Sequence, residues 1–155
     1  MHRTSPTALR ALWRSARRGA AIIEFALILP LVILLMVGLF DLGFGAYQLI
    51  QVHAAAEAGA QYAARHSWDA TAIAAAVTSA TGTSGVAATP APSQVCGCPD
   101  GGTFTPMPSC GTCPSGSPAG VYASVSAQLT YSPVLPYPGL SDPLTLTGQA
   151  YRRLN

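Results

Sequence analysis

The chain has 155 residues, a formal net charge of +2 and only 9% charged residues, while half of its residues are hydrophobic. The apolar residues crowd into 20–50, so only one small outer domain can form beside them. Clustered arginine next to an apolar run of membrane length indicates retention on the cytoplasmic side of a membrane and argues against nucleic-acid binding. Five of the eight cationic residues form this cluster: Arg3, Arg10, Arg14, Arg17 and Arg18.

The first predicted element is a membrane-spanning helix at 20–46. From Phe25 to Phe40 no side chain is charged or hydrogen-bonding. With the apolar residues from Ala20 onward, the run measures about 30 Å as a helix at ~1.5 Å per residue, which is the thickness of a bilayer core. Pro30 lies inside the run. Membrane helices tolerate proline because neighbouring groups satisfy the freed carbonyl, so we expect a kink near 26–30.

Glu24 is the feature that a plain apolar span leaves unexplained, because an ionised carboxylate in hydrocarbon is costly without a partner. A cleavable secretory signal would be cut near "HAAAEA". The apolar run is longer than the ~7 to 15 residues of such signals, and Glu24 would interrupt its start. A signal anchor fits the length but gives Glu24 no role. A prepilin-type leader, cut after a glycine on the cytoplasmic side, does give it one.

The motif "RRG" followed by "AAIIEF" matches that leader, with glutamate at the fifth position after the cut. The longer stretch "RRGAAIIEFALILPLVILLMVGLFDLGFGAYQ" resembles the signature of TadE-like proteins, which are minor pseudopilins of tight-adherence (Flp-type) pilus systems. The resemblance covers about 17–65 and depends on "EFALILP" and "GLFDLG" occurring in one register. It implies a basic leader at 1–19. The residues that it assigns to leader cleavage and assembly are Gly19, Ala20, Glu24 and Phe25.

The resemblance also gives Glu24 a partner. Cutting after Gly19 creates a positively charged α-amino group on Ala20, about one helical turn from the Glu24 carboxylate, and pairing lowers the cost of burying the acid. In pilin-like assemblies the amine of a neighbouring subunit takes this place. The alternative is that Glu24 lies in the headgroup region. The implied partners are the prepilin peptidase, the major pilin and sister pseudopilins, the inner-membrane assembly platform and the bilayer.

A second acid, Asp41, marks the outer boundary of the span. It either extends into water or pairs with a cation on another subunit. Glycines surround it, and small residues allow close approach between helices in lipid. The predicted helix-packing patch therefore consists of Pro30, Gly38, Asp41, Gly43 and Gly45.

The segment 47–81 is predicted to be a helical stalk followed by a second helix. Alanine-rich sequence without proline continues the first helix to about Arg65, and Asp69 can cap a short helix that ends near Ala80. In the stalk a polar residue recurs every four positions, which places these residues on one face of the helix. These residues are His53, Glu57, Gln61 and Arg65. The first two could be metal ligands, but two ligands without a third favour a solvated face instead. TadE-like chains commonly have arginine where this chain has Gln61. A salt bridge made by that arginine in the family is therefore not expected at Gln61.

All four cysteines lie in a Gly/Pro-rich loop predicted at 82–120, as "CGC" (Cys96, Cys98) and "CGTC" (Cys110, Cys113). Two close pairs can hold zinc, but an amino end in the cytoplasm places this loop on the oxidising side of the membrane, where disulfides form. Bridges between the two arms are favoured, as 96 to 113 with 98 to 110 or as 96 to 110 with 98 to 113. A "CGTC" redox site lacks the flanking strand and helix that it requires.

The last segment, 121–155, alternates apolar and polar residues in "VYASVSAQLTY" and again in "LTLTGQAYRRL", which predicts an antiparallel hairpin. Arg152 and Arg153 are expected at the surface. The complete chain is thus expected to be α+β: a long amino-terminal helix continuing as a stalk, a short second helix and a small disulfide-braced antiparallel β region.

The resemblance implies a non-enzymatic minor pseudopilin in a bacterial inner membrane, with its amino terminus cytoplasmic and its carboxyl domain periplasmic. It would prime assembly of a tight-adherence pilus or enter the fibre. No nucleophile with a placed base, cofactor site or metal site is predicted. Two alternatives remain: an uncut, membrane-anchored periplasmic binding module, and a secreted disulfide-rich or redox protein.

Overall fold

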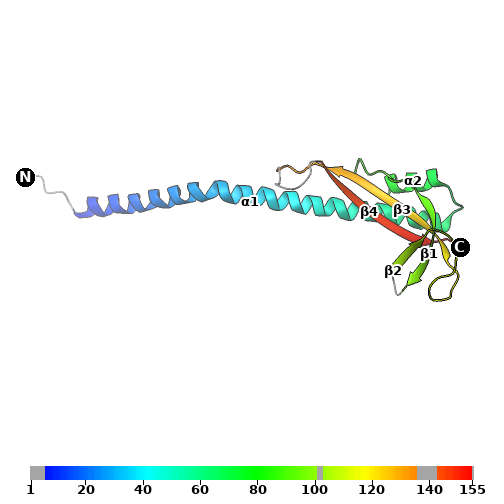
Figure 1. The fold of residues 1–155 in the computed structure, drawn as a ribbon. Helices are drawn as coiled ribbons and strands as arrows, with labels where there is room; N and C mark the ends of the chain where they lie inside the picture. Colours follow the sequence, from blue (N-terminus) through cyan, green and yellow to red (C-terminus); the bar gives the residue numbers. More distant parts are fainter. Residues whose placement is uncertain (1–5, 101–102, 136–142, 155) are drawn as a thin grey trace, which may run out of the picture. The chain divides into compact units, whose positions relative to one another are not determined.

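The computed structural model describes residues 6–100, 103–135 and 143–154 and has the predicted α+β fold (Figure 1). It divides into two compact units, Met1–Leu42 and Gly43–Asn155, which are described separately. The elements in chain order are α1 (Pro6–Arg65), α2 (Ala70–Ser79), β1 (Ser93–Asp100), β2 (Thr103–Met107), β3 (Gly120–Tyr131) and β4 (Leu144–Arg153).

Helix α1 begins earlier than the predicted membrane helix. It starts at Pro6, so most of the predicted basic leader is helical as well. Proline suits the first helical position because its fixed φ matches the helix and its missing N–H has no partner there. The helix runs through Pro30 and ends at Arg65, as predicted, where the backbone N–H of His66 donates to the carbonyl of Tyr62.

Helix α2 forms where Asp69 was predicted to cap it. The Asp69 carboxylate accepts hydrogen bonds from the backbone N–H groups of Thr71 at 2.9 Å and Ala72 at 3.2 Å, which satisfies donors that the first turn cannot pair. Ile73 and Val77 are fully buried. The helix is too short to be stable alone, so burial of these two side chains holds it in place.

The four strands form one antiparallel sheet in the order β2-β1-β3-β4. The predicted hairpin is confirmed: β3 pairs with β4 from Tyr122 opposite Arg153 to Tyr131 opposite Leu144. The hairpin β1–β2 lies inside the segment that sequence analysis treated as a cysteine loop. The glycines and prolines of this hairpin obscure the alternation of apolar and polar residues that predicts a strand. Pro106 is tolerated because β2 is an edge strand.

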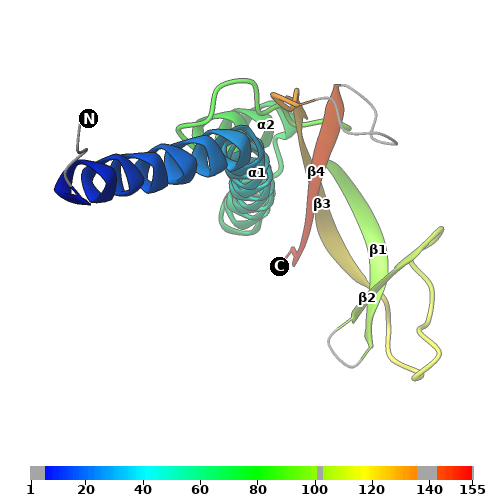
Figure 2. The same ribbon diagram turned by 90° about the vertical axis from the view of Figure 1, so that its left-hand side faces the viewer.

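The core lies between one face of this sheet and the helices α1 and α2, both of which are on the same side of β3 and β4 (Figure 2). Small residues bring α1 close to the strands. The buried core residues are Val52, Ala55, Ala56, Ala60, Ala63, Ile73, Val77, Val86, Ala123, Val125, Ala127, Leu129 and Leu146.

Two glycines permit the closest approaches in this core. A Cβ added to Gly148 of β4 would lie 2.9 Å from the Cα of His53 and from the carbonyl oxygen of Val52. A Cβ added to Gly59 of α1 would lie 3.0 Å from Cγ1 of Val125 and would overlap Val77. Helix α1 therefore packs its backbone almost directly on the sheet.

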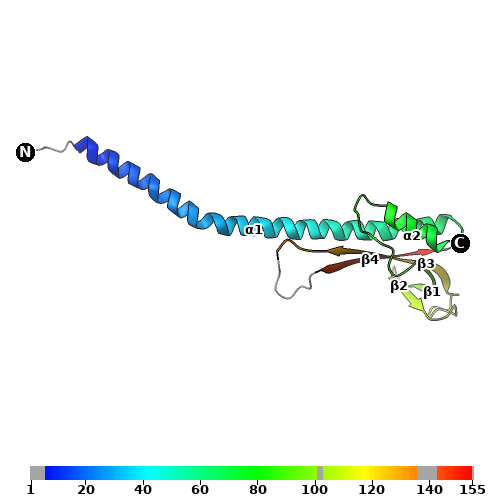
Figure 3. The ribbon, with the colours of Figure 1, turned by 90° about the horizontal axis from the view of Figure 1, so that it is seen from above.

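Strand β3 runs antiparallel to the helix that it covers (Figure 3). Near one end Val125 lies against Gly59, and at the other end Cε1 of Tyr131 lies 3.3 Å from a Cβ added to Gly45. Six strand residues rise about 20 Å, and the fourteen helix residues between these glycines rise about 21 Å. The strand and the helix therefore stay in register along this contact.

Candidate functional site

The first candidate site is the outward surface of α1. From Ile22 to Phe40 the large apolar side chains are almost all exposed, with Leu27 and Leu39 each 74% exposed. The helix from Ala21 to Arg65 is long and apolar enough to cross a membrane. A contiguous apolar surface of this kind requires a cover of lipid or of other apolar helices.

The predicted cleavage and assembly residues lie in one continuous stretch of α1. Gly19 and Ala20 belong to the helix backbone. Glu24 and Phe25 follow on the next turn, and both side chains are exposed. Because Ile22, Ile23 and Phe25 around it are also exposed, Glu24 projects a carboxylate from an apolar surface. That arrangement favours a partner of opposite charge.

The predicted packing patch is divided between different environments. Asp41, for which extension into water and pairing with a cation on another subunit were the two alternatives, is only 5% exposed. Gly45 is in contact with the ring of Tyr131, whereas a Cβ at Gly43 would meet nothing within 4 Å. Gly38 is half-buried and Pro30 exposed. Gly43 and Gly45 therefore do not share one face of α1. Gly45 packs against Tyr131 of the same chain, whereas the space beside Gly43 is empty.

The polar residues of the stalk share one face, as predicted. His53, Glu57, Gln61 and Arg65 are all exposed, on the side of α1 away from the core. Among the residues that the structure describes, no group of three His, Cys, Asp or Glu side chains could hold a metal ion. The exposure of all four side chains makes this face of α1 a solvated surface.

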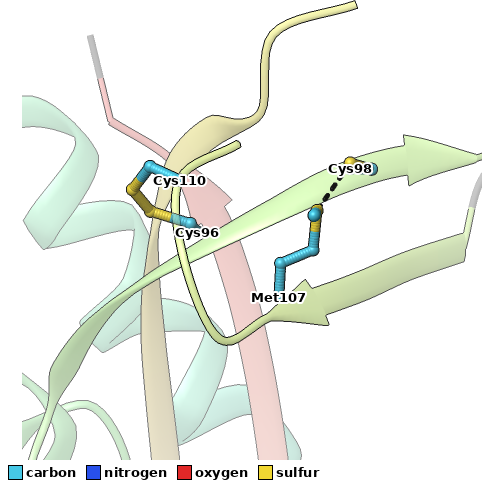
Figure 4. The surroundings of a disulfide bond; sticks show 4 residues. All are labelled: Cys96, Cys98, Met107 and Cys110. Atoms are coloured by element: carbon cyan, nitrogen blue, oxygen red, sulfur yellow. Dashed lines mark hydrogen bonds between the residues drawn. A yellow bond between two sulfur atoms is a disulfide. The ribbon is translucent and has the colours of Figure 1, made fainter. Parts of the chain in front are cut away.

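The second candidate site is the cysteine region (Figure 4). Disulfides join Cys96 to Cys110 and Cys98 to Cys113, which is one of the two pairings between the arms. All four sulfur atoms are therefore used in disulfides. The Sγ of Cys98 also lies 3.2 Å from the Sδ of Met107. Because a disulfide sulfur carries no proton, this is a packing contact that ties β1 to β2.

An aromatic cluster on the sheet is a feature that sequence analysis missed. The ring of Phe104 in β2 lies 4.4 Å from the ring of Tyr151 in β4 and 4.7 Å from that of Tyr122 in β3, measured between centroids. Phe104 reaches these strands by lying across Gly97 of β1, where any Cβ would overlap its ring. The sequence signal was the aromatic residue in "TFTPM", which has meaning only once β2 is recognised as a strand.

The two disulfides are expected to differ in their access to reductant. Cys98 and Cys113 are each 5% exposed, whereas Cys110 is exposed and Cys96 half-buried. Because exchange requires a thiolate to reach a sulfur atom, we expect Cys96–Cys110 to be reduced first. Limited reduction, alkylation and peptide mass spectrometry measure the order. Labelling of Cys98 and Cys113 ahead of Cys110 would contradict the burial described above.

The fold and the α1 surface together define a class of protein: a small disulfide-containing α+β domain that follows one apolar helix of membrane-spanning length. Within that class, residues 19–61 match the family model described as TadE-like protein. No curated protein and no solved structure matches the chain. The matched segment makes residues 19–61 similar to TadE-like proteins, and it is consistent with a pilus-associated protein.

Proposed function

We propose that this protein is a minor pseudopilin that a prepilin peptidase cuts between Gly19 and Ala20. The observation that carries the proposal is the exposed apolar surface of α1, from which Glu24 projects five positions after Gly19. The family match begins at that same glycine. A new amine on Ala20 gives the carboxylate a partner of opposite charge, and the apolar surface gives the helix a means of lateral packing.

The mechanism is assembly through the helix. In the inner membrane, with the amino end cytoplasmic, α1 packs against the helices of the major pilin and of sister pseudopilins. The Glu24 carboxylate pairs with a subunit amine and sets the axial register between neighbours. The Gly43–Asn155 unit lies in the periplasm, where oxidising conditions maintain its disulfides. Processing and docking involve the prepilin peptidase and the assembly platform.

The first test is the amino-terminal residue of the protein made in cells that contain the matching prepilin peptidase. Mass spectrometry of the first peptide is expected to give Ala20. Gly19→Val is expected to block the cut and leave a chain that is longer by residues 1–19. Gly43→Val is the matched control, because position 43 has open space around it and lies outside the cleavage motif.

Each alternative has its own result in this test. A start at Met1 in the wild-type protein would leave an uncut anchored domain, and the pilus mechanism would lose the amine that Glu24 needs. A start beyond Ala54 together with a soluble product would indicate a secreted protein.

A further inference from the structure

The end of β3 lies beside the last apolar turns of the helix. Tyr131 has its ring centroid 6.1 Å from that of Phe44, and the Phe44 ring is 6.4 Å from that of Tyr47. Tyr131 also contacts Gly45. These aromatic residues form a cluster, here called the aromatic collar, that consists of Phe44, Tyr47 and Tyr131.

In the part of the chain that the structure describes, large apolar side chains are exposed around the aromatic collar. Phe44 and Tyr47 are each more than half exposed, and Ile50 is 65% exposed one turn further on. After the strand ends, Val134 is 77% exposed. No charged residue occurs in 42–52 or in 131–135. The opposite end of the β3–β4 hairpin is different, because Tyr122 there pairs with Arg153 and Ala123 with Arg152. The hairpin therefore has one apolar and one basic end.

The position of the aromatic collar along α1 indicates what covers it. The helix from Ala20 to Tyr47 measures about 40 Å at 1.5 Å per residue, which is close to the ~40 to 45 Å of a bilayer including its headgroups. Tyrosine concentrates at that interface because its ring is apolar and its hydroxyl group hydrogen-bonds with water.

We propose that the segment Tyr131–Leu135 at the end of β3 contacts the outer surface of the bilayer that α1 crosses. The inference rests on the proposed function insofar as α1 must span the membrane. It adds a second point of lipid contact, at the end of β3, which restricts the rotation of the Gly43–Asn155 unit relative to the bilayer. The occupant of the apolar surface is the interfacial layer of phospholipid.

The test uses the complete chain in nanodiscs of phosphatidylethanolamine and phosphatidylglycerol. A nitroxide on the acyl chain near the headgroup broadens amide resonances that lie at that depth. We expect the amides of Val134 and Ala46 to lose most of their intensity and that of Gly111, in the cysteine region, to keep it. Val134→Asp is expected to restore intensity at Ser132 and Leu135. Val121→Asp is the matched control, because Val121 is exposed at the other end of β3.

Three results overturn the inference, and they have different meanings. Broadening at Phe40 without broadening at Val134 shows that α1 spans the bilayer while the end of β3 stays in water. Shifts at Val134 that grow with the protein-to-lipid ratio, without nitroxide broadening, place a second copy of the chain there. If the Phe40 amide is not broadened, α1 does not span the bilayer. The proposed function and the inference are then both wrong.

Discussion

Replacing Gly148 with valine is expected to destabilise the Gly43–Asn155 unit by about 3 kcal/mol or more. The added Cβ would lie 2.9 Å from three atoms of the α1 backbone, in Val52 and His53. Flexible side chains could yield, but a helix backbone cannot yield without moving the helix away from the sheet. Strand propensity acts in the opposite direction, because valine is favoured in strands over glycine, but that scale spans only ~1 kcal/mol. The steric clash is therefore the larger effect, and we expect Gly148→Val to lower the free energy of unfolding.

Denaturant unfolding, followed by near-ultraviolet circular dichroism in detergent, measures this loss. Thr147→Val is the matched control: it lies one residue away on β4 with its side chain exposed, so its effect is expected within about 0.5 kcal/mol. If Gly148→Val is as stable as the wild type, β4 does not pack directly on α1, and the description of the core is wrong.

Removing the charge of Glu24 is expected to lower the incorporation of this protein into pilus assemblies by at least tenfold. In the proposed mechanism, the Glu24→Gln side chain keeps its size but would leave the Ala20 amine without a counter-charge in the low-dielectric environment of the membrane. Loss of one partner from a buried pair costs about 3 to 5 kcal/mol, and each 1.4 kcal/mol corresponds to about a factor of ten. Even a partly solvated pair therefore gives a measurable loss. Immunoblotting of sheared surface fractions against membrane fractions measures incorporation.

Two controls separate assembly from processing. Incorporation of Glu24→Gln is compared only for chains that mass spectrometry shows to begin at Ala20, because an uncut chain has no α-amino group at that position and would report on cleavage instead of pairing. Glu24→Asp keeps the charge on a shorter side chain and is expected to retain part of the incorporation. Normal incorporation of Glu24→Gln would remove the charge pair from the mechanism.

Long, regular patterns made much of the fold predictable. The end of α1 at Arg65, the Asp69 cap and the pairing of β3 with β4 all follow from signals within one segment: alanine content, a carboxylate before a helix, and alternation. The hairpin β1–β2 was not predicted because Gly97 and Pro106 reduce local strand propensity. Contacts with other parts of the chain stabilise it, including those of the Phe104 ring with Tyr122 and Tyr151 and the two disulfides.

The candidate site was predictable to a different degree. Glu24 stands out in the sequence because a charge inside an apolar run is costly, whatever the fold. The role of Gly45 was not accessible in this way. Its nearest neighbour outside its own helix, Tyr131, is far along the chain, so the glycine pattern alone suggested packing between separate helices. The role of Gly148 was not predicted either, because the α1 backbone that lies against it is far away along the chain.

The alignment of β3 along α1 also determines how the domain would carry load. The strand and helix lie antiparallel in contact for about 20 Å, with Val125 against Gly59 near one end and Tyr131 against Gly45 at the other. A pull along the helix axis, as a growing or retracting fibre would apply, acts along this seam in shear. The contacts must then yield together, whereas a force that peeled the sheet away would break them one at a time. The small alanine-rich core is therefore oriented so that its resistance is greatest along the direction of the helix.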